Sequence, residues 1–163
     1  MGLPGQQHMR TDICSSPAGR YVGVIGAGEC DADLERLAED VGRGVAEAGA
    51  VLVCGGMRGV MEAACRGAKA AGGLTIGILP GRDRSEANAF VDVAVATGIN
   101  EARNLTIIRT ADALIAVGGS YGTLSEIGFA LKAGKKVVGL ATWDIKGIVP
   151  AATPEEAVRL AME

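Results

Sequence analysis

Three glycine-rich turns, each placed directly after a short apolar segment, restrict the fold of this chain more than any other feature. The apolar segments are residues 21–25, 51–54 and 113–117, and the turns are residues 26–28, 55–59 and 118–123. Apolar residues at helical spacing follow the third turn, namely Leu124, Ile127, Gly128 and Leu131. Short buried strands that alternate with amphipathic helices are typical of a parallel sheet. The chain is therefore predicted to be an α/β protein with helices on both faces of the sheet.

Further strand and helix signals continue this alternation. Asp31 is a predicted N-cap for a helix that ends at Gly49. Thr153 and Pro154 predict the N-cap and the first residue of a last helix at 155–162. We expect other helices at 60–71, 100–110 and 124–134, other strands at 74–79, 91–95 and 137–140, and a loop at 82–88. This order predicts a single-domain, doubly wound parallel sheet of the Rossmann-like type with right-handed crossovers.

The length and composition of the chain fit one domain with an aliphatic core. Of the 163 residues, 48% are hydrophobic but only 3% are aromatic, and 25 are glycine. The core is therefore expected to consist of Ala, Val, Leu and Ile packed close to the backbone. Residues 20–163 are assigned to this domain. Residues 1–19 are rich in Gly, Pro, Ser and Gln and are predicted to be a flexible tail, in which Met9 is an alternative start.

Charge and cysteine content limit the cellular compartment and the classes of binding partner that we expect. Sixteen basic and nineteen acidic side chains give a formal net charge of −3 without a basic stretch, so no binding of nucleic acid is expected. Cys14, Cys30, Cys54 and Cys65 show no CxxC pairing, and no signal-like segment starts the chain, which indicates reduced thiols in the cytoplasm. No apolar run is long enough to span a membrane. The only histidine, His8, lies in the tail, so neither Ser-His-Asp chemistry nor a metal site is expected.

The carboxyl ends of the strands form the predicted ligand site. In a doubly wound sheet these ends lie at one edge, where ligands bind. A glycine-rich turn that leads into a helix points free N–H groups and the positive end of the helix dipole at an anion, above all at a phosphate. The residues expected to contact the phosphate or the rest of the ligand are Gly26, Gly28, Gly55, Gly56, Met57, Arg58, Gly59, Gly118, Gly119, Ser120, Tyr121, Gly122 and Thr123.

Three features near this edge have two interpretations each. The 26–28 turn resembles the start of a dinucleotide fingerprint, but Asp31 stands where the third glycine belongs, so ordinary NAD binding is disfavoured. The 55–59 turn is either a simple strand-to-helix turn or, as we favour, a second wall of the anion pocket with Arg58 as a fork for phosphate or carboxylate. Cys30 precedes a helix, a position that can lower a thiol pKa, although a small filler role is more common there.

Glu126 lies just after the 118–123 turn, which we call the phosphate turn, and its carboxylate needs an explanation there. Thr123 and Glu126 have the Thr-x-x-Glu spacing of a capping box, in which the glutamate only accepts a hydrogen bond from the start of the helix. Arg103, in the preceding predicted helix, is expected to point toward the same edge. An arginine beside a glutamate at such a turn forms either an ion pair or an acid/base pair. If the protein is an enzyme, Arg103 and Glu126 are its candidate catalytic residues.

These motifs resemble the family of LOG-type cytokinin-riboside-monophosphate phosphoribohydrolases, many of which carry the label "possible lysine decarboxylase". The hallmark of that family is PGGxGTxxE, preceded by a helix that starts with an arginine and by a GG-x-x-G-x-M turn. The resemblance covers residues 21–140. The matching residues are Arg103 for the arginine, Gly122, Thr123 and Glu126 for the GTxxE part, and Gly55, Gly56, Gly59 and Met61 for the earlier turn.

The chain departs from the hydrolases in two motifs. It has Gly118-Gly119-Ser120 where they have Pro-Gly-Gly, and Glu62 where they usually have glycine. In this it is similar to the molybdenum-cofactor carrier branch, whose members bind a pterin monophosphate. The resemblance implies a cytoplasmic binding or carrier protein for a nucleotide or a molybdopterin-type cofactor, assembled as a homo-oligomer, a dimer or a tetramer.

The resemblance also implies an alternative function as a hydrolase. A nucleoside 5′-monophosphate N-glycosidase would release base and ribose 5-phosphate. Glu126 would then stabilise an oxocarbenium-like state or activate water, and Arg103 would orient the phosphate or help the leaving base. No cofactor is needed for this reaction. Pyridoxal-dependent lysine decarboxylation is not expected, because no lysine lies in a recognisable cofactor motif.

Overall fold

The computed structural model describes residues 19–163. The strands are β1 (Tyr21–Gly26), β2 (Val51–Cys54), β3 (Thr75–Leu79), β4 (Val93–Ala96), β5 (Ala113–Val117), β6 (Lys136–Leu140) and β7 (Ile148–Ala151). The helices are α1 (Ala32–Glu47), α2 (Val60–Ala70), α3 (Asn104–Thr110), α4 (Tyr121–Lys132) and α5 (Pro154–Met162), and 3₁₀ turns cover Arg84–Glu86 and Asn100–Arg103. The tail predicted at 1–19, with His8, Met9 and Cys14, lies outside the described residues apart from Gly19.

The strands form one parallel sheet in the order β4-β3-β2-β1-β5-β6-β7. The chain adds β2, β3 and β4 on one side of β1 and then returns to place β5 on the other side. The pairing of β1 with β5 runs from Val22 opposite Ala113 to Gly26 opposite Val117. The connections therefore diverge between β1 and β5, which is where doubly wound sheets bind ligands. The predicted α/β fold is confirmed.

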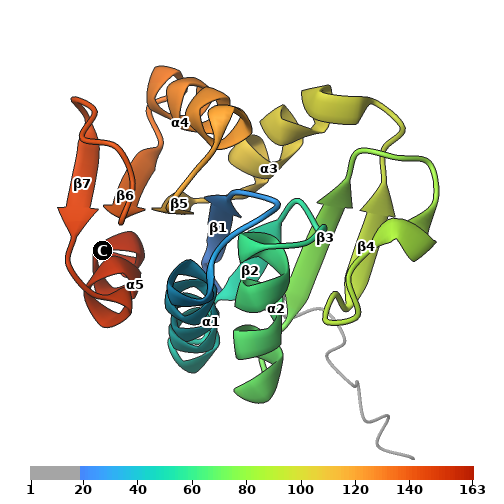
Figure 1. Cartoon of the computed structure of the whole chain (residues 1–163), viewed down its shortest axis with the longest axis horizontal. Helices are drawn as coiled ribbons and strands as arrows, with labels where there is room; N and C mark the ends of the chain where they lie inside the picture. Colours follow the sequence, from blue (N-terminus) through green and yellow to red (C-terminus); the bar gives the residue numbers. More distant parts are fainter. Residues whose placement is uncertain (1–18) are drawn as a thin grey trace, which may run out of the picture.

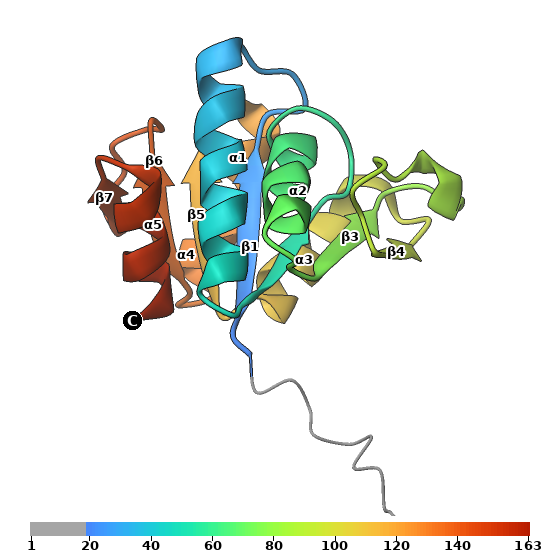
Figure 2. The same ribbon diagram turned by 90° about the horizontal axis from the view of Figure 1, so that it is seen from below.

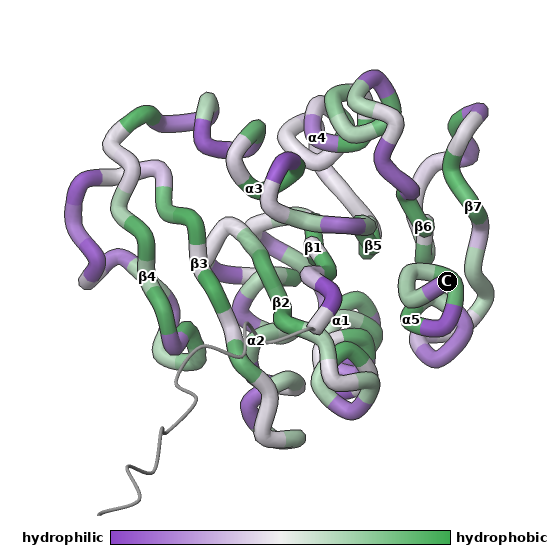
Figure 3. The backbone as a smooth tube through the Cα atoms, turned by 180° about the vertical axis from the view of Figure 1, so that it is seen from behind, coloured by the Kyte–Doolittle hydropathy of each residue, from purple (hydrophilic) through white to green (hydrophobic). Residues whose placement is uncertain are grey.

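Helices cover both faces of the sheet, with α1, α2 and α5 on one face and α3 and α4 on the other (Figures 1 and 2). One buried cluster joins α1, α2 and α5 to the sheet and includes Val41 and Val158. The other lies on the side of α3 and α4 and includes Ile107 and Ile127. In Figure 3 the strands are largely green, the colour of hydrophobic residues. The buried hydrophobic residues described are all Ala, Val, Leu, Ile or Cys. None of the helices described for residues 19–163 has the length and apolarity that a membrane span requires.

Two segments at the outer parts of the fold differ from the predicted pattern. The sequence does not predict β7, because Pro150 lacks an N–H and counts against a strand. Since β7 lies at the edge of the sheet, the proline is tolerated. The helix predicted at 100–110 is divided into a 3₁₀ turn and α3, and its first residue, Asn100, has a positive φ of 51°. The loop predicted at 82–88 contains one 3₁₀ turn.

Helix α4 begins at Tyr121 and not at residue 124. Its buried residues are Thr123, Glu126, Ile127 and Ala130. Leu124, one of the apolar residues at helical spacing, is 36% exposed and does not belong to this buried set. The helix therefore turns two polar residues inward, next to the carboxyl ends of the strands.

Helices α1 and α2 pack closely because each has a glycine at the contact. A β-carbon added at Gly42 would lie 1.9 Å from the carbonyl oxygen of Ala64, and one added at Gly67 would lie 1.9 Å from that of Glu39. Backbone therefore meets backbone at both positions. Any larger residue there requires the two helices to separate.

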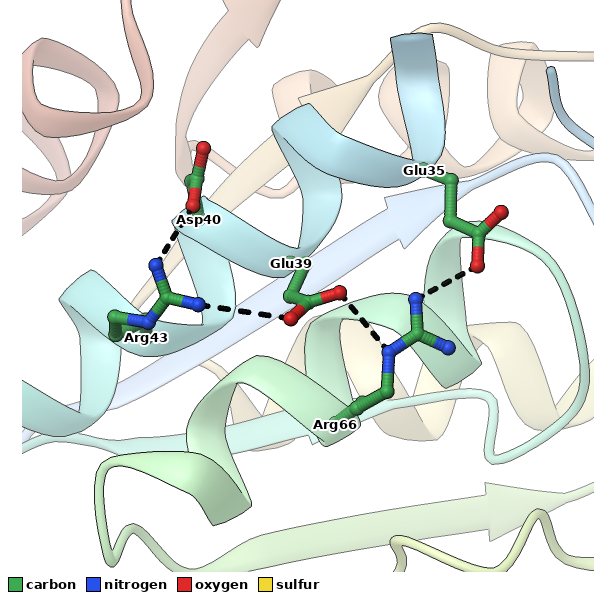
Figure 4. Close-up of polar contacts among 5 residues, drawn as sticks. All are labelled: Glu35, Glu39, Asp40, Arg43 and Arg66. Carbon is green, nitrogen blue, oxygen red and sulfur yellow. Dashed lines mark hydrogen bonds and ion pairs between the residues drawn. The ribbon is translucent and has the colours of Figure 1, made fainter. Parts of the chain in front are cut away.

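An ion-pair network spans the outer side of the same contact (Figure 4). Arg66 of α2 lies 2.7 Å from Glu35 and 2.9 Å from Glu39 of α1. Within α1, Arg43 lies 2.9 Å from Asp40 and 3.5 Å from Glu39. These side chains are partly exposed, so each pair contributes at most about 1 kcal/mol. The close glycine packing, more than the charges, holds α1 against α2.

We expect Gly67→Ala to lower the free energy of unfolding by about 1–3 kcal/mol, because the added carbon has no space between the two backbones. Gly128→Ala in α4 is the matched control, since no atom lies within 4 Å of its added β-carbon. That variant should stabilise the protein by up to about 1 kcal/mol through helix propensity. Urea unfolding measures both. Equal changes in the two variants would show that propensity, not the helix contact, decides.

Candidate functional site

A cavity of about 230 Å³ opens at the edge of the sheet where β1 and β5 end. Its lining combines the turn after β1, the start of α2, the end of β3, the 3₁₀ turn before α3 and the start of α4. The lining residues are Gly26, Gly28, Met61, Pro80, Glu101, Arg103, Asn104, Ser120, Gly122, Thr123 and Glu126. The cavity thus lies at the point where the connections of the sheet diverge.

The start of α4 offers backbone donors at this cavity. Ser120 is the N-cap, and its N–H donates to the Thr123 hydroxyl over 3.2 Å as part of a Ser120–Thr123 capping box. The predicted capping box of Thr123 and Glu126 is therefore wrong, because the helix begins earlier and Glu126 lies in its second turn. Helix geometry leaves the N–H groups of Tyr121 and Gly122 without an intrahelical acceptor. Together with the helix dipole, these groups suit an anion.

Arg103 supplies the buried guanidinium of the cavity. Its side chain is only 11% exposed, and its Nη1 donates to the side-chain oxygen of Asn104. Its Nε is buried without a hydrogen-bond partner among the described residues. Gly55 makes this placement possible, since a β-carbon there would lie 2.8 Å from Arg103 Nη2 and 2.7 Å from the sulfur of Met61. The guanidinium therefore crosses the end of β2 and keeps donor capacity for an anion.

Glu126 is the buried carboxyl group of the cavity. Its side chain is 9% exposed, and its Oε1 lies 4.0 Å from Arg103 Nη1, too far for a hydrogen bond. Burial raises the pKa of Glu126 to about 7, and Arg103 offsets this only in part. Burial also lowers the pKa of Arg103, against the opposing effect of Glu126. A carboxyl group that titrates near neutral pH beside a cavity is able to exchange a proton with a bound molecule.

The 55–59 turn shapes the cavity through its backbone. Gly59 has a φ of 64°, and a β-carbon there would lie 2.4 Å from the carbonyl oxygen of Ala27. The first two glycine-rich turns therefore pack directly against each other. Gly56, with a φ of 72°, packs against Leu79 at the end of β3. Only glycine fits these two positions, and neither residue lines the cavity described above.

Six further residues predicted to contact the ligand, Gly55 among them, do not line this cavity. Arg58 is exposed, Met57 is half-buried, and Tyr121 is 89% exposed. Gly118 and Gly119 pack against side chains of α1 and of the segment after β6. The guanidinium of the cavity is therefore that of Arg103, and not that of Arg58.

A second cavity of about 310 Å³ adjoins the first at Gly28. It also contains Cys30, whose pKa is raised by burial and then by the carboxylates of Glu35 and Asp31. The structure therefore argues against a reactive thiol at this helix start and favours the filler role. Within residues 19–163, no three His, Cys, Asp or Glu side chains lie close enough together to hold a metal ion.

Sequence reasoning did not single out Pro80, Glu101 or Asn104 as site residues. A signal for each was present. Pro80 directly follows a buried strand at the ligand edge, and Glu101 and Asn104 flank Arg103 along the chain. The division of the predicted 100–110 helix into two pieces places these neighbours at the cavity.

Comparison with known proteins places the chain among relatives of similar length. Residues 19–162 match the model of the SLOG cluster4 family. An uncharacterized protein of Archaeoglobus fulgidus is 52% identical over 138 residues, which cover 84% of this chain and 91% of that protein.

Two solved structures are similar over nearly their whole length. The molybdenum cofactor binding protein from the phototrophic bacterium Rippkaea orientalis has 37% sequence identity and a TM-score of 0.84, over 88% of this chain and 96% of that one. The molybdenum cofactor carrier protein MCP from Chlamydomonas reinhardtii has 33% identity and a TM-score of 0.79, over the same shares of the two chains, 88% and 96%.

Proposed function

Because this chain belongs to the SLOG cluster4 family, a LOG-like family, we propose that it binds and carries a phosphorylated heterocycle, either a nucleotide or a molybdopterin-type cofactor. The observation that carries the proposal is the start of α4 beside a cavity that also contains the buried Arg103. Two solved relatives, described as binding or carrying molybdenum cofactor, support the ligand class.

The donor set of the cavity fits the phosphate of such a ligand. The N–H groups of Tyr121 and Gly122 and the hydroxyl of Ser120 would hold its oxygens, and Arg103 would balance its charge. Within residues 19–163 the Nε of Arg103 has no hydrogen-bond partner, so the guanidinium keeps unused donor capacity. A β-carbon added at Gly28 would meet no atom within 4 Å, so a ligand is able to approach the backbone there. Carriage needs no covalent step from these residues.

Compartment and assembly belong to the same proposal. Free thiols at Cys54 and Cys65 suit a reducing compartment such as the cytoplasm. Leu124 and Phe129 of α4 are large apolar residues with exposed surface, which suits contact with a second copy of the chain. Light scattering tests the assembly, and a monomeric mass would exclude the homo-oligomer.

Tyr121→Pro tests the phosphate site by removing a single donor. Proline is tolerated at the first position of a helix. Ser120 already has the extended backbone, φ −131° and ψ −177°, that a residue before proline requires. The variant should therefore fold normally but bind GMP and ribose 5-phosphate about tenfold more weakly, because one N–H bond to a charged group is lost. Calorimetric titration measures the affinities.

Tyr121→Ala is the matched control for this experiment. It removes the exposed ring and keeps the backbone N–H, so its affinity for both ligands should equal that of the wild type. Unchanged binding in Tyr121→Pro would remove the start of α4 from the site. A wild-type protein that binds no nucleoside monophosphate and no molybdopterin-type cofactor would refute the proposal as a whole.

Glu126 favours a second candidate function, that of a nucleoside 5′-monophosphate N-glycosidase. A buried carboxyl group with a pKa of about 7, 4.0 Å from an arginine, has the properties of a general acid or base. It would stabilise the oxocarbenium-like transition state or activate water, while Arg103 orients the phosphate. Chromatography of AMP and GMP reactions tests this function. No release of free base by the wild-type protein would exclude it for these substrates.

A further inference from the structure

The segment after β6 forms a further concave surface beside the phosphate turn, separate from the two cavities described above. Trp143, the only tryptophan of the chain, lies against Gly119, where an added β-carbon would be 2.6 Å from its Cζ3. Even so, Trp143 is 38% exposed. A cavity of about 300 Å³ is lined by Gly118, Gly119, Ala141, Thr142 and Trp143. An aromatic ring that is open to a cavity in this way is available for stacking.

A polar atom without a partner belongs to the same surface. Oγ1 of Thr142 is buried and has no hydrogen-bond partner among the described residues. Thr142 and Trp143 line both this cavity and an adjoining one of about 280 Å³ between β6 and β7. A buried hydroxyl without a partner costs free energy, and a ligand atom in the cavities that Thr142 lines would supply the partner once the side chain turns toward it.

The phosphate turn connects this surface to the cavity of about 230 Å³ that contains Arg103 and Glu126, here called the anion cavity. Ser120 and Gly122 line the anion cavity. Gly118 and Gly119, which directly precede Ser120, line the cavity beside Trp143. Since consecutive residues are about 3.8 Å apart, a small molecule with its phosphate at the start of α4 is able to reach Trp143 with another part.

We propose that Trp143 and Thr142 form the ring subsite for the ligand. A planar nitrogen heterocycle, such as a purine or a pterin, stacks on the indole, and an atom at its edge hydrogen-bonds to the Thr142 hydroxyl. This inference rests on the proposed function, because it takes the phosphate at the start of α4 as its fixed point. Stacking accepts many bases, so the hydroxyl supplies the selectivity between rings.

The fluorescence of Trp143 reports whether a ring occupies the proposed subsite. Saturating GMP is expected to quench the tryptophan fluorescence, after correction for nucleotide absorbance, whereas ribose 5-phosphate, which lacks a ring, leaves it unchanged. Calorimetry measures the binding of both ligands independently. If neither ligand binds, the proposed function fails together with the subsite. If both bind and GMP leaves the fluorescence unchanged, only the ring subsite is overturned.

Substitutions separate stacking from support of the turn. Trp143→Leu should weaken GMP binding about tenfold, within the range for loss of one stacked base, and leave the affinity for ribose 5-phosphate unchanged. Trp143→Phe retains a ring and should retain most of the GMP affinity. Equal losses for both ligands in Trp143→Leu would show that the indole only supports Gly119. A GMP-specific loss in Tyr121→Ala instead would place the ring on the other side of the turn. Either result would overturn the proposal.

Discussion

Replacing Arg103 with methionine is expected to weaken the binding of both GMP and ribose 5-phosphate by about 100-fold. The guanidinium is buried and one of its donors has no partner within residues 19–163, so a phosphate in the cavity would gain a charge-assisted hydrogen bond away from water. Methionine fills similar space without the charge. The affinities for the two ligands should fall by the same factor, because Arg103 would contact the sugar phosphate, which is the part that both ligands contain. Calorimetric titration of both ligands measures the loss.

Arg58→Met is the matched control for this substitution. Arg58 belongs to the 55–59 turn at the same edge, but its side chain is exposed and does not line the cavity. Its loss should change either affinity by less than about twofold, since an exposed charge is screened by water and salt. If Arg58→Met instead loses 100-fold and Arg103→Met does not, the phosphate lies against the 55–59 turn.

The contrast between the two arginines shows what sequence alone was able to predict. Strand order and glycine spacing place Arg58 and Arg103 at one edge of the sheet. They do not give the direction of either side chain. That direction depends on Gly55, whose missing side chain leaves room for the guanidinium of Arg103 across the end of β2. This is a contact between segments almost fifty residues apart, and no local pattern records it.

The strands were predictable to different degrees for a physical reason. The bounds of β2, Val51–Cys54, and β5, Ala113–Val117, agree with the predicted ones, because strands buried on both faces appear as unbroken apolar runs. Strand β7, Ile148–Ala151, lies at the edge of the sheet and contains a proline. The strand is held in place by its pairing with β6 rather than by its own composition. Its sequence is therefore similar to that of a loop.

The ring subsite was missed for a related reason. Trp143 belongs to no motif, and no helix or strand signal surrounds it. It meets the phosphate turn only because β5 and β6 are neighbours in the sheet, with Val117 paired to Leu140. The glycine at position 119 is the signal that was present, and the Pro-Gly-Gly of the hydrolases has a glycine at the same place. The small residue at 119 makes room for the indole.

Replacing Glu126 with glutamine is expected to raise the free energy of unfolding by about 3 kcal/mol at pH 8 and to change it little at pH 5. The pKa of Glu126 is raised from 4.5 to about 7 in the folded protein. Between these values the folded state holds a proton that the unfolded chain has released. The stability of the wild-type protein therefore falls as the pH rises from 4.5 to 7 and loses nothing more to this group above that range. Urea unfolding across this pH range measures the effect.

Glutamine resembles the protonated carboxyl group and has no proton to release, so the fall should be absent in Glu126→Gln. Glu101→Gln changes an exposed carboxylate of the same cavity and should keep the fall, which makes it the matched control. A fall that persists in Glu126→Gln would assign the titration to another group.

The same variant separates the two candidate functions, because the carboxyl group affects a bound phosphate and a reacting sugar in opposite ways. For a carrier, loss of the negative charge beside the phosphate should strengthen GMP binding at pH 8, by about tenfold, and neither protein releases base. For an N-glycosidase, Glu126→Gln should still bind GMP but release guanine at least about 100-fold more slowly. Calorimetry and chromatography on one pair of proteins therefore decide whether the cost of burying this carboxyl group serves catalysis. If Glu126→Gln binds GMP as the wild type does, and neither protein releases base, Glu126 has neither role.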